Sequence, residues 1–400
     1  MIDHSVPLVD EDKETGLQLY CHVKTSNDDA SWMSTARGVV FEKDSDDVYM
    51  IGVPYCKEYH DEEDYGKHLK PYYDYDIYDS HEGTIIRVFF YKTKWYTSTH
   101  RKLDAFKSKW ASLRTSFGES FAYHMRKLLP SVAEAEETGG DKDYLNAVYE
   151  TYFDRDHRYI FLLKSSADER IVCKAVEKDA ILHVATISEG RLDYDAVLPP
   201  FPKPAKHPRI ETPAELDSLL FSINPNDLQG VLLIDKQTGE HIKIYTRHYK
   251  TLFDARNNVP SIRFRYYQLL AAGDTDTLHR LKQMYPEVDF RKIQNDLEKA
   301  CIYLYHKYIA RYVYKETFIM DPACHYVLCK AHEMYKEDHK PIVVQKIKSI
   351  VAKSPTLMNK VVKCYKKMIY DISSVYNDAA ASTAPRCRAT KPKATPLTLP

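Results

Sequence analysis

The spacing of apolar residues changes along the chain, and this change separates two kinds of structure. In the first part apolar and polar residues alternate, as in Gly83–His100 ("GTIIRVFFYKTKWYTSTH"), which is typical of strands. From about Ser261 onward apolar residues recur three and four positions apart, which is typical of helices. The sequence therefore predicts a mostly β part, residues 1–258, and a helical part, residues 259–376.

The first part carries three predicted hairpins and three segments of another kind. Asp104–Leu129 has apolar residues at helical spacing and is predicted to be a helix, broken at Gly118. Residues 198–213 hold six prolines and predict an extended connector on the surface. Thr212 and Glu215, three residues apart, then predict a capped helix. The hairpins are Ser34–Tyr55, Gly83–His100 with Ile85, Val88 and Phe90 directed to a core, and Leu228–Tyr249.

The two ends of the chain differ in charge, although the formal net charge is zero. Residues 1–80 hold 7 Lys and Arg against 19 Asp and Glu, whereas residues 301–400 hold 17 against 7. The basic C-terminal helices can therefore attract nucleic acid, an acidic protein partner or the acidic front of a second copy. Residues 377–400 are small, Pro-rich and basic, so they bury too little apolar surface to order themselves, and we expect a disordered tail.

Eight cysteines are scattered along the chain and no CxxC pair occurs. Their one cluster, with neighbouring histidines, lies in a helical stretch, whereas zinc sites usually bring ligands from a second hairpin. We therefore assign this cluster a structural role and predict no metal site. Without a signal peptide or a long apolar run, we expect a soluble protein of a reducing compartment that binds no membrane. The cluster consists of Cys324, His325, Cys329 and His332.

Five segments of the β part occur in an order known from one enzyme family. They are "ARGVVFE", "SHEGTIIRVFFYKTKWYTST", "YIFLLKSSADERIV", "LQGVLLID" and "HIKIYTRHY". Residues 30–260 thereby resemble the phage-type, ATP-dependent RNA ligases of the covalent nucleotidyltransferase superfamily. The resemblance implies an α+β fold, in which an ATP-grasp-like nucleotidyltransferase domain of antiparallel sheets with flanking helices precedes an all-α C-terminal domain. The helices after "NNVPSIRFRYYQLLAAGD" resemble those attached to ligase domains of large DNA viruses.

The resemblance matches each functional position of the family to one residue of this chain. Positions that do covalent or metal chemistry have lost the required group: Ser80 replaces the nucleophilic lysine, Leu162 and Gln229 replace glutamates, and Tyr245 replaces a lysine. Positions expected to contact a nucleotide are Arg37, Glu82, Gly83, Arg170, Gln229 and Lys243. The cation after the second strand falls on His100 or Arg101, and the RNA contacts are Arg247 and Lys250.

Three hypotheses about function follow from this pattern. The first is a catalytically inactive, RNA-ligase-like pseudoenzyme, cytoplasmic or virion-associated, which needs no cofactor and binds RNA, nucleotide or a protein partner. The second is an active RNA ligase that uses ATP and Mg²⁺ with a relocated lysine, for which the candidates are Lys67, Lys70, Lys92 and Lys94. The third is a structural or virion-associated scaffold. Further candidates for RNA contacts are Arg87 for phosphates and Tyr72, Tyr73, Tyr75 and Tyr78 for bases, although these tyrosines can equally pack a loop.

Overall fold

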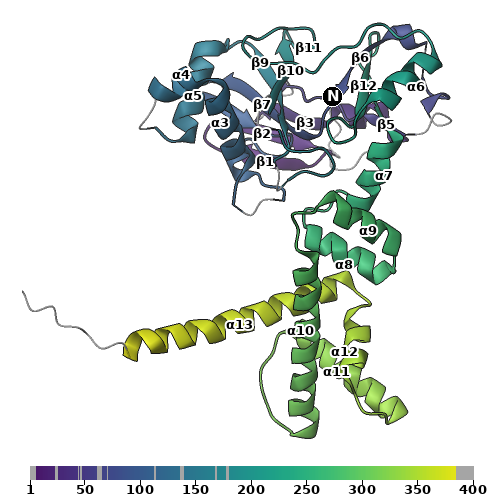
Figure 1. Cartoon of the computed structure of the whole chain (residues 1–400). Coiled ribbons are helices and arrows are strands. Elements are labelled where there is room, and N and C mark those ends of the chain that lie inside the picture. The colour runs from purple at the N-terminus through teal and green to yellow at the C-terminus, as the bar shows by residue number, and fades with distance from the viewer. Residues whose placement is uncertain are drawn as a thin grey trace, which may run out of the picture. The chain divides into compact units, whose positions relative to one another are not determined.

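The chain folds into two compact units, with the boundary between Ile262 and Arg263. A computed structural model describes residues 6–22, 26–43, 45, 47–60, 65–69, 71–111, 114–135, 139–166, 169–176 and 180–383. The first unit contains antiparallel sheets with helices, and the second contains helices, so the predicted α+β class is confirmed (Figure 1).

The described residues of the first unit form three sheets. The N-terminal sheet has the order β1 (Leu8–Asp12), β2 (Leu17–Cys21), β3 (Arg37–Glu42), β4 (Val48–Met50). The central sheet has the order β11 (Arg191–Asp193), β10 (Ile181–Ser188), β9 (Arg158–Lys164), β7 (Gly83–Tyr91), β8 (Lys94–Ser98). The third sheet has the order β5 (Lys57–Tyr59), β13 (His241–Tyr245), β12 (Gly230–Asp235), β6 (Tyr75–Ser80), and its β13–β5 pair is parallel.

Short helices surround these sheets. They are α1 (Ser31–Thr35), η1 (Tyr72–Asp74), η2 (Ala105–Lys107), α3 (Phe117–Leu128), α4 (Pro130–Ala135), α5 (Asp141–Tyr152), α6 (Pro213–Ser222) and α7 (Arg247–Arg256). Thr212 caps α6 as predicted, because its hydroxyl accepts a hydrogen bond from the Glu215 backbone N–H.

The central sheet is buried on both faces. Ile86 and Val88 of β7 pack in the core that contains α3 and α5, whereas Phe89 and Tyr91 pack in the core shared with the N-terminal sheet. A strand covered on both sides carries apolar residues at consecutive positions, which hides its alternation. The predicted core set is confirmed at Val88 and at Ile85, which is half-buried and packs against the core shared with the N-terminal sheet. It was wrong at Phe90, which is half-buried and belongs to neither core.

The helix predicted over Asp104–Leu129 is shorter than its apolar spacing suggested. It begins at Phe117, because Ser116 and Glu119 form a reciprocal capping box in which each side chain accepts the backbone N–H of the other. Gly118 does not break α3. A Cβ at this position would lie 2.5 Å from the Phe106 ring, so the glycine allows close packing of the helix.

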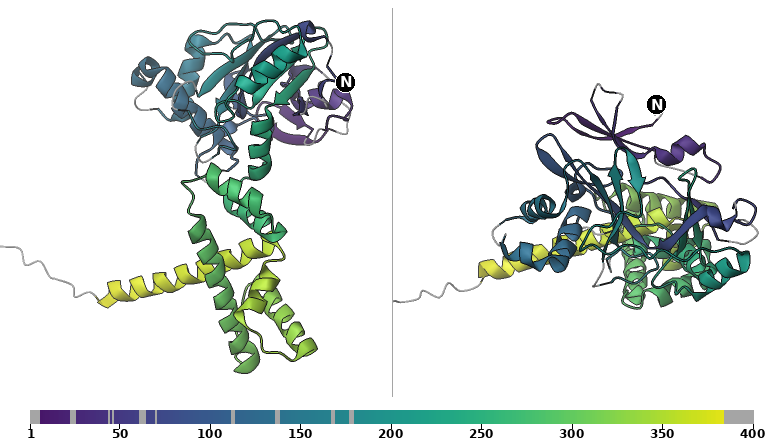
Figure 2. Two further views of the ribbon diagram at one scale, coloured as in Figure 1. Left: turned by 45° about the vertical axis from the view of Figure 1, so that its right-hand side comes forward. Right: turned by 90° about the horizontal axis from the view of Figure 1, so that it is seen from above.

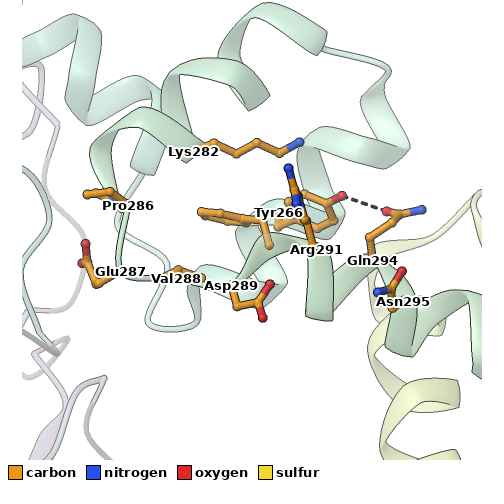
Figure 3. Close-up of a pocket in the computed structure, with 10 residues that line it drawn as sticks. Tyr266, Lys282, Pro286, Glu287, Val288, Asp289, Arg291, Gln294 and Asn295 are labelled. Carbon is orange, nitrogen blue, oxygen red and sulfur yellow. Dashed lines mark hydrogen bonds between the residues drawn. The ribbon is translucent and has the colours of Figure 1, made fainter.

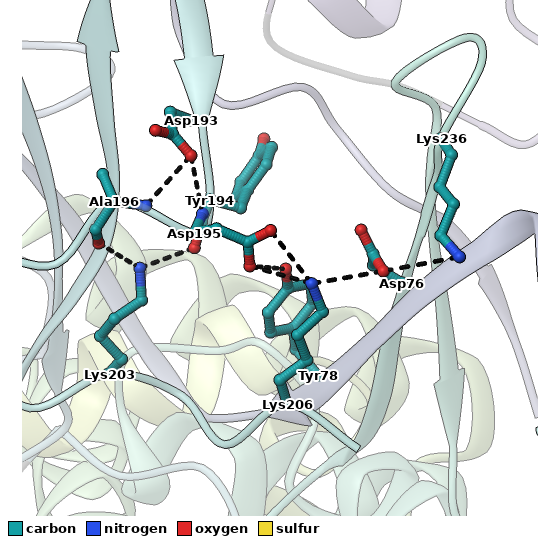
Figure 4. Close-up of polar contacts among 9 residues, drawn as sticks. All are labelled: Asp76, Tyr78, Asp193, Tyr194, Asp195, Ala196, Lys203, Lys206 and Lys236. Carbon is teal, nitrogen blue, oxygen red and sulfur yellow. Dashed lines mark hydrogen bonds and ion pairs between the residues drawn. The ribbon is translucent and has the colours of Figure 1, made fainter. Parts of the chain in front are cut away.

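The Pro-rich connector covers the free edge of the third sheet. Its backbone pairs with β6 through the bridge between Tyr78 and Lys206, and the Asp79 N–H donates to the Ala205 carbonyl at 2.9 Å. Lys206 Nζ lies 2.9 Å from Asp195 and 3.3 Å from Asp76, and the Tyr78 hydroxyl also donates to Asp195 (Figure 4). These contacts satisfy the edge strand and hold the connector against β6.

The second unit is a helical assembly. Its helices are α8 (Ile262–Ala272), which begins at the boundary, α9 (Thr275–Met284), α10 (Phe290–Tyr308), the π-helical turn η3 (Ile309–Val313), α11 (Pro322–Asp338), α12 (Val344–Val351) and α13 (Pro355–Thr383). Helix α13 crosses α10 and extends well beyond it (Figure 2). None of the described helices is long and apolar enough to cross a membrane.

Helix α13 reaches further than the sequence analysis expected. It continues through 377–383, a segment assigned to the tail, because the alanines there favour helix. The rest of the predicted tail, residues 384–400, lies outside the described residues.

Replacing Gly83 by Ala should destabilise the first unit by about 2 kcal/mol or more, because the new Cβ would lie 2.3 Å from the Leu163 carbonyl oxygen of β9. Gly140→Ala is the matched control, since its Cβ meets only Asp143 at 3.8 Å, and it should cost no more than about 1 kcal/mol. Chemical denaturation measures both. Equal losses would contradict the assigned close approach of β7 and β9.

Candidate functional site

A cavity of about 980 Å³ lies in the first unit. The central sheet contributes the start of β7, Leu162 of β9 and the segment that follows β8. The third sheet contributes the end of β6 and two residues of β13, and Arg37 comes from β3. The structure therefore brings chain segments that are distant in sequence to one concave site.

Most of the residues singled out from the sequence line this cavity. Five of the predicted nucleotide contacts do so, namely Arg37, Glu82, Gly83, Gln229 and Lys243, together with Ser80, Leu162, His100 and Arg101. Arg170 does not line it, and its guanidinium lies 3.5 Å from the Val172 carbonyl. Tyr245 is buried, and its hydroxyl donates to Glu58 at 2.8 Å.

The segment from Ser80 to Gly83 is where the chain crosses from the third sheet to the central sheet. Ser80, the last residue of β6, pairs with Gly230 of β12. Gly83, the first residue of β7, pairs with Lys164 of β9. Only His81 and Glu82 separate the two strands, so the side chains of this crossing must lie at the junction of the sheets.

The Glu82 carboxylate is 5% exposed and accepts hydrogen bonds from four groups of the protein. The donors are the backbone N–H groups of Ile171, Val172 (2.8 Å) and Cys173 (3.2 Å), and the Tyr249 hydroxyl (3.1 Å). A buried carboxylate is tolerated when its lone pairs are satisfied in this way. We therefore assign Glu82 the structural task of holding the loop after β9 and helix α7 at the cavity.

Ser80 belongs to a chain of hydrogen bonds that ends at Glu82. Its hydroxyl donates to Gln229 Oε1 at 3.2 Å, and the Gln229 amide N–H donates to the Tyr249 hydroxyl at 2.8 Å. Tyr249 then donates to Glu82. An amide oxygen does not act as a general base, so this arrangement orients the Ser80 hydroxyl without activating it.

Cations outnumber acids around the cavity. Among the described residues its lining contains Arg37, Arg101, Lys102, Lys107, Lys109 and Lys243 against Asp79, Glu82 and Glu169. Asp79 is engaged by His207 Nε2 at 2.8 Å, and Glu82 by the four donors above. Within the described part of the chain, Arg37 and Lys243 form no ion pair, and Arg37 Nε has no hydrogen-bond partner. The cavity therefore has a surplus of positive charge.

Three histidines of the lining are held neutral. Burial, together with the positive charge of Arg37, lowers the pKa of His100 to about 3 and that of His241 to about 4. Burial and Lys164 likewise lower the pKa of His81 to about 4. In the described part of the chain, the Nδ1 atom of each imidazole lacks a hydrogen-bond partner. An anion in the cavity would reduce the repulsion among the cations of its lining.

Several further candidates from the sequence serve the fold instead. Arg87 is 1% exposed and donates to the Gly38 carbonyl, the Ser98 hydroxyl and the Thr99 carbonyl, so it fixes the end of β8 and does not contact a phosphate. Tyr75 and Tyr78 are buried, and Tyr72 packs against the core of the third sheet, so these three are not base-stacking platforms. The side chain of Tyr73 lies outside the described residues.

The predicted RNA contacts lie on α7, outside the lining of the cavity. Arg247 is exposed at the first helical position. Lys250 Nζ lies 2.6 Å from Asp254, one turn further along the helix. The sequence alone did not indicate Lys102, Lys107, Lys109 or His241 as cavity residues, since the segments that carry them become neighbours only in the folded chain.

The helical unit has a second cavity, of about 690 Å³, lined by residues of α8, α9 and the start of α10 (Figure 3). The Tyr266 hydroxyl donates to Gln294 Oε1 at 2.8 Å, and Lys282 Nζ lies 5.7 Å from the Tyr266 ring centroid. Lys282 and Arg291 are accompanied by Glu287 and Asp289, so the charges here are balanced. This cavity lacks the surplus of cations found in the first unit.

The chain is similar to viral proteins named immediate-early protein ICP-46 or its homologue. It is 27% identical to the homologue of Invertebrate iridescent virus 6 over 82% of this chain and 76% of that protein. It is 33% identical to the homologue of Invertebrate iridescent virus 3 over 60% of this chain and 50% of that protein. For the protein of Frog virus 3 the identity is 27%, over 67% of this chain and 66% of that protein. No family model matches the chain.

The solved structures similar to this chain include ligases. A putative ATP-dependent DNA ligase from Aquifex aeolicus is 15% identical, with a TM-score of 0.36 and coverage of 83% of this chain and 78% of that one. An archaeal ATP-dependent RNA ligase is 12% identical, with a TM-score of 0.36 and coverage of 81% and 82%. Because these scores are low, the chemistry of the ligases is not transferred to this chain from them.

Glu82→Gln should destabilise the first unit by about 2–4 kcal/mol, since the amide N–H₂ of glutamine would face backbone N–H donors and leave them unsatisfied. Glu240→Gln is the control, because Glu240 forms an exposed ion pair with Lys57 that should contribute no more than about 1 kcal/mol. Urea denaturation followed by far-UV circular dichroism measures both. A loss for Glu82→Gln no larger than for Glu240→Gln would contradict the structural role of Glu82.

His241 is fully buried, and its pKa of about 4 lies below that of an unfolded histidine, about 6.5. As the pH falls, the unfolded chain therefore binds a proton at this histidine before the folded chain does. The free energy of unfolding then decreases between pH 6.5 and pH 4, and at pH 5 it is lower by about 2 kcal/mol than above pH 6.5. His241→Gln should lose correspondingly less stability between pH 7 and pH 5. His248→Gln, at an exposed position of α7, should follow the wild type, and identical slopes for all three proteins would contradict the assignment.

Proposed function

We propose that the cavity of the first unit binds a phosphate-bearing ligand, a nucleotide or RNA, and that the protein does not transfer AMP. The chain is then a ligase-like protein that retains a binding site and lacks the covalent chemistry. The observation that supports this proposal best is the charge of the lining, where Arg37 and Lys243 form no ion pair within the described residues.

The binding step follows from that charge. Phosphates are attracted by fixed cations in a concave site, where the surrounding protein reduces screening by water. The guanidinium carbon of Arg37 lies 4.6 Å from the centroid of the Tyr55 ring, and this contact restricts the orientation of the guanidinium group. Lys243 Nζ lies 5.6 Å from the Tyr245 ring centroid. A cation already held in place loses less entropy when a ligand arrives.

The absence of AMP transfer is inferred from Ser80. A phosphoramidate intermediate needs an amine, and a serine hydroxyl needs a base to become a nucleophile. Ser80 donates its hydrogen bond to the Gln229 amide, which cannot remove the proton. Leu162, an apolar residue, lines the same cavity where the family has a glutamate.

The relocated-lysine alternative finds less support. Lys92 Nζ lies 2.9 Å from Glu42, and Lys94 Nζ lies 2.9 Å from both Asp12 and Glu14. Neither these two lysines nor Lys67 line the cavity, and Lys70 is outside the described residues. A structural scaffold does not need to bind a ligand. A binding measurement therefore distinguishes the scaffold hypothesis from our proposal.

Incubation with α-labelled ATP and Mg²⁺ or Mn²⁺, followed by a denaturing gel, should leave the protein unlabelled. An active ATP-dependent ligase treated in parallel provides the positive control. Ser80→Lys should also remain unlabelled, because the groups lost at Leu162, Gln229 and Tyr245 are not restored. A label that survives denaturation and disappears on replacement of one lysine would refute the proposal.

Fluorescence anisotropy with a short, 5′-phosphorylated RNA should show binding that persists in EDTA and weakens steeply with salt. Arg37→Ala combined with Lys243→Ala should weaken it at least 10-fold and reduce the slope of log K against log salt by about 1.4. Lys92→Ala combined with Lys94→Ala removes the same charge outside the cavity and should change the affinity less than 2-fold. An equal loss of affinity in the two double variants would show that RNA binds to the charged surface in general, which would contradict binding in the cavity.

A further inference from the structure

Three potential metal ligands converge in the helical unit, away from the cavity described above. Asp321 lies at the N-cap of α11, Cys324 lies in its first turn, and Cys364 comes from α13. One carboxylate oxygen and the two Sγ atoms all lie within 4.8 Å of one another. In the part of the chain that the structure describes, no other group of three such side chains is as close.

We propose that Asp321, Cys324 and Cys364 bind a zinc ion, with water in the fourth position. Zinc takes thiolate and carboxylate ligands at about 2.0–2.3 Å in a tetrahedral arrangement, which places ligand atoms roughly 3.4–3.8 Å apart. The three atoms are within about 1 Å of that separation, so small rotations of the side chains complete the site. Two thiolates favour zinc over magnesium or calcium.

The backbone already positions two of the ligands. Asp321 accepts the Ala323 backbone N–H at 2.8 Å, and this N-cap contact fixes its carboxylate at the start of α11. Cys324 is three residues further along, so both side chains belong to the same turn. The partial positive charge at the N-terminus of this 17-residue helix stabilises a thiolate and a carboxylate together.

Within the described residues, Asp321 forms no ion pair with a lysine or arginine. Cys324 is buried, Cys364 is half-buried and Asp321 is exposed, so the site is open to solvent on the carboxylate side. Zinc would displace the thiol protons of Cys324 and Cys364 and join the start of α11 to α13.

The site differs from the cluster that the sequence suggests. Cys329 Sγ lies 3.6 Å from His325 Nδ1, and the His332 ring stacks on Tyr312 at 3.9 Å. These three side chains contact each other or η3, and none of them joins Cys324. The ligand that completes the pair comes instead from Cys364, forty positions along the chain.

The test uses the full chain, purified with reductant and freed of metal. Titration with Co²⁺ should give one equivalent bound, with the thiolate charge-transfer and tetrahedral d–d bands, and one equivalent of Zn²⁺ should displace it. Cys324→Ser and Cys364→Ser should each weaken zinc binding at least 100-fold. Asp321→Asn keeps the N-cap and should weaken it at least 10-fold. Cys329→Ser, on the same helix, should leave the affinity unchanged.

At one equivalent, zinc should also raise the melting temperature of the wild type and of Cys329→Ser by clearly more than that of the three ligand variants. Circular dichroism establishes that each variant keeps its helices. If Cys364→Ser fails to fold, Asp321→Asn decides the question, because its only loss is an exposed carboxylate. No thiolate band with Co²⁺, or an equal effect of Cys329→Ser, would overturn the proposal. Detection of a Cys324–Cys364 disulfide in place of metal would do the same.

Discussion

The buried carboxylate of Glu82 is the group on which the geometry of the cavity depends. It lies where the chain crosses from the third sheet to the central sheet, and its four donors come from the loop after β9 and from α7. A buried charge is costly unless its hydrogen bonds are complete, so these segments are held at fixed positions. The Ser80 hydroxyl is oriented by the same network, through Gln229 and Tyr249.

The charge of the cavity follows from how its acids are used. Glu82 is engaged by the backbone, and Asp79 by His207, which leaves the cations of the lining without these carboxylates as partners. Burial and the neighbouring cations keep His100 and His241 neutral, and this limits the repulsion. Binding of an anion is therefore favourable at this site, and Ser80 is not activated as a nucleophile that would react with it.

The sequence predicted the local elements well and the long-range contacts poorly. Alternation identified the three hairpins, and the Thr212 cap of α6 was confirmed, because these signals lie within a few residues. Helix α5 was not predicted, and the start of α3 was wrong, since apolar spacing alone does not show where a capping box begins a helix. The burial of Arg87 was missed because its partners, apart from those on the adjoining strand, lie far away in sequence.

The fold brings most of the motif residues together at the cavity, but the spacing of these residues in the sequence did not predict the role of each. Glu82 occupies a motif position and is used to hold the backbone, whereas Lys107, which no motif indicated, lines the cavity. The chain is similar to the ICP-46 homologue of Invertebrate iridescent virus 6 over most of its length, and the name of that protein states no activity. Function therefore has to be tested at the cavity itself.

The most direct test is a crystal structure of the protein with ATP in the presence of EDTA. Our account predicts triphosphate density beside Arg37 and Lys243, with no covalent bond to Ser80 or to any lysine. Density for AMP attached to a lysine would contradict the inactive site. An empty cavity at saturating ATP would contradict the binding of nucleotide there.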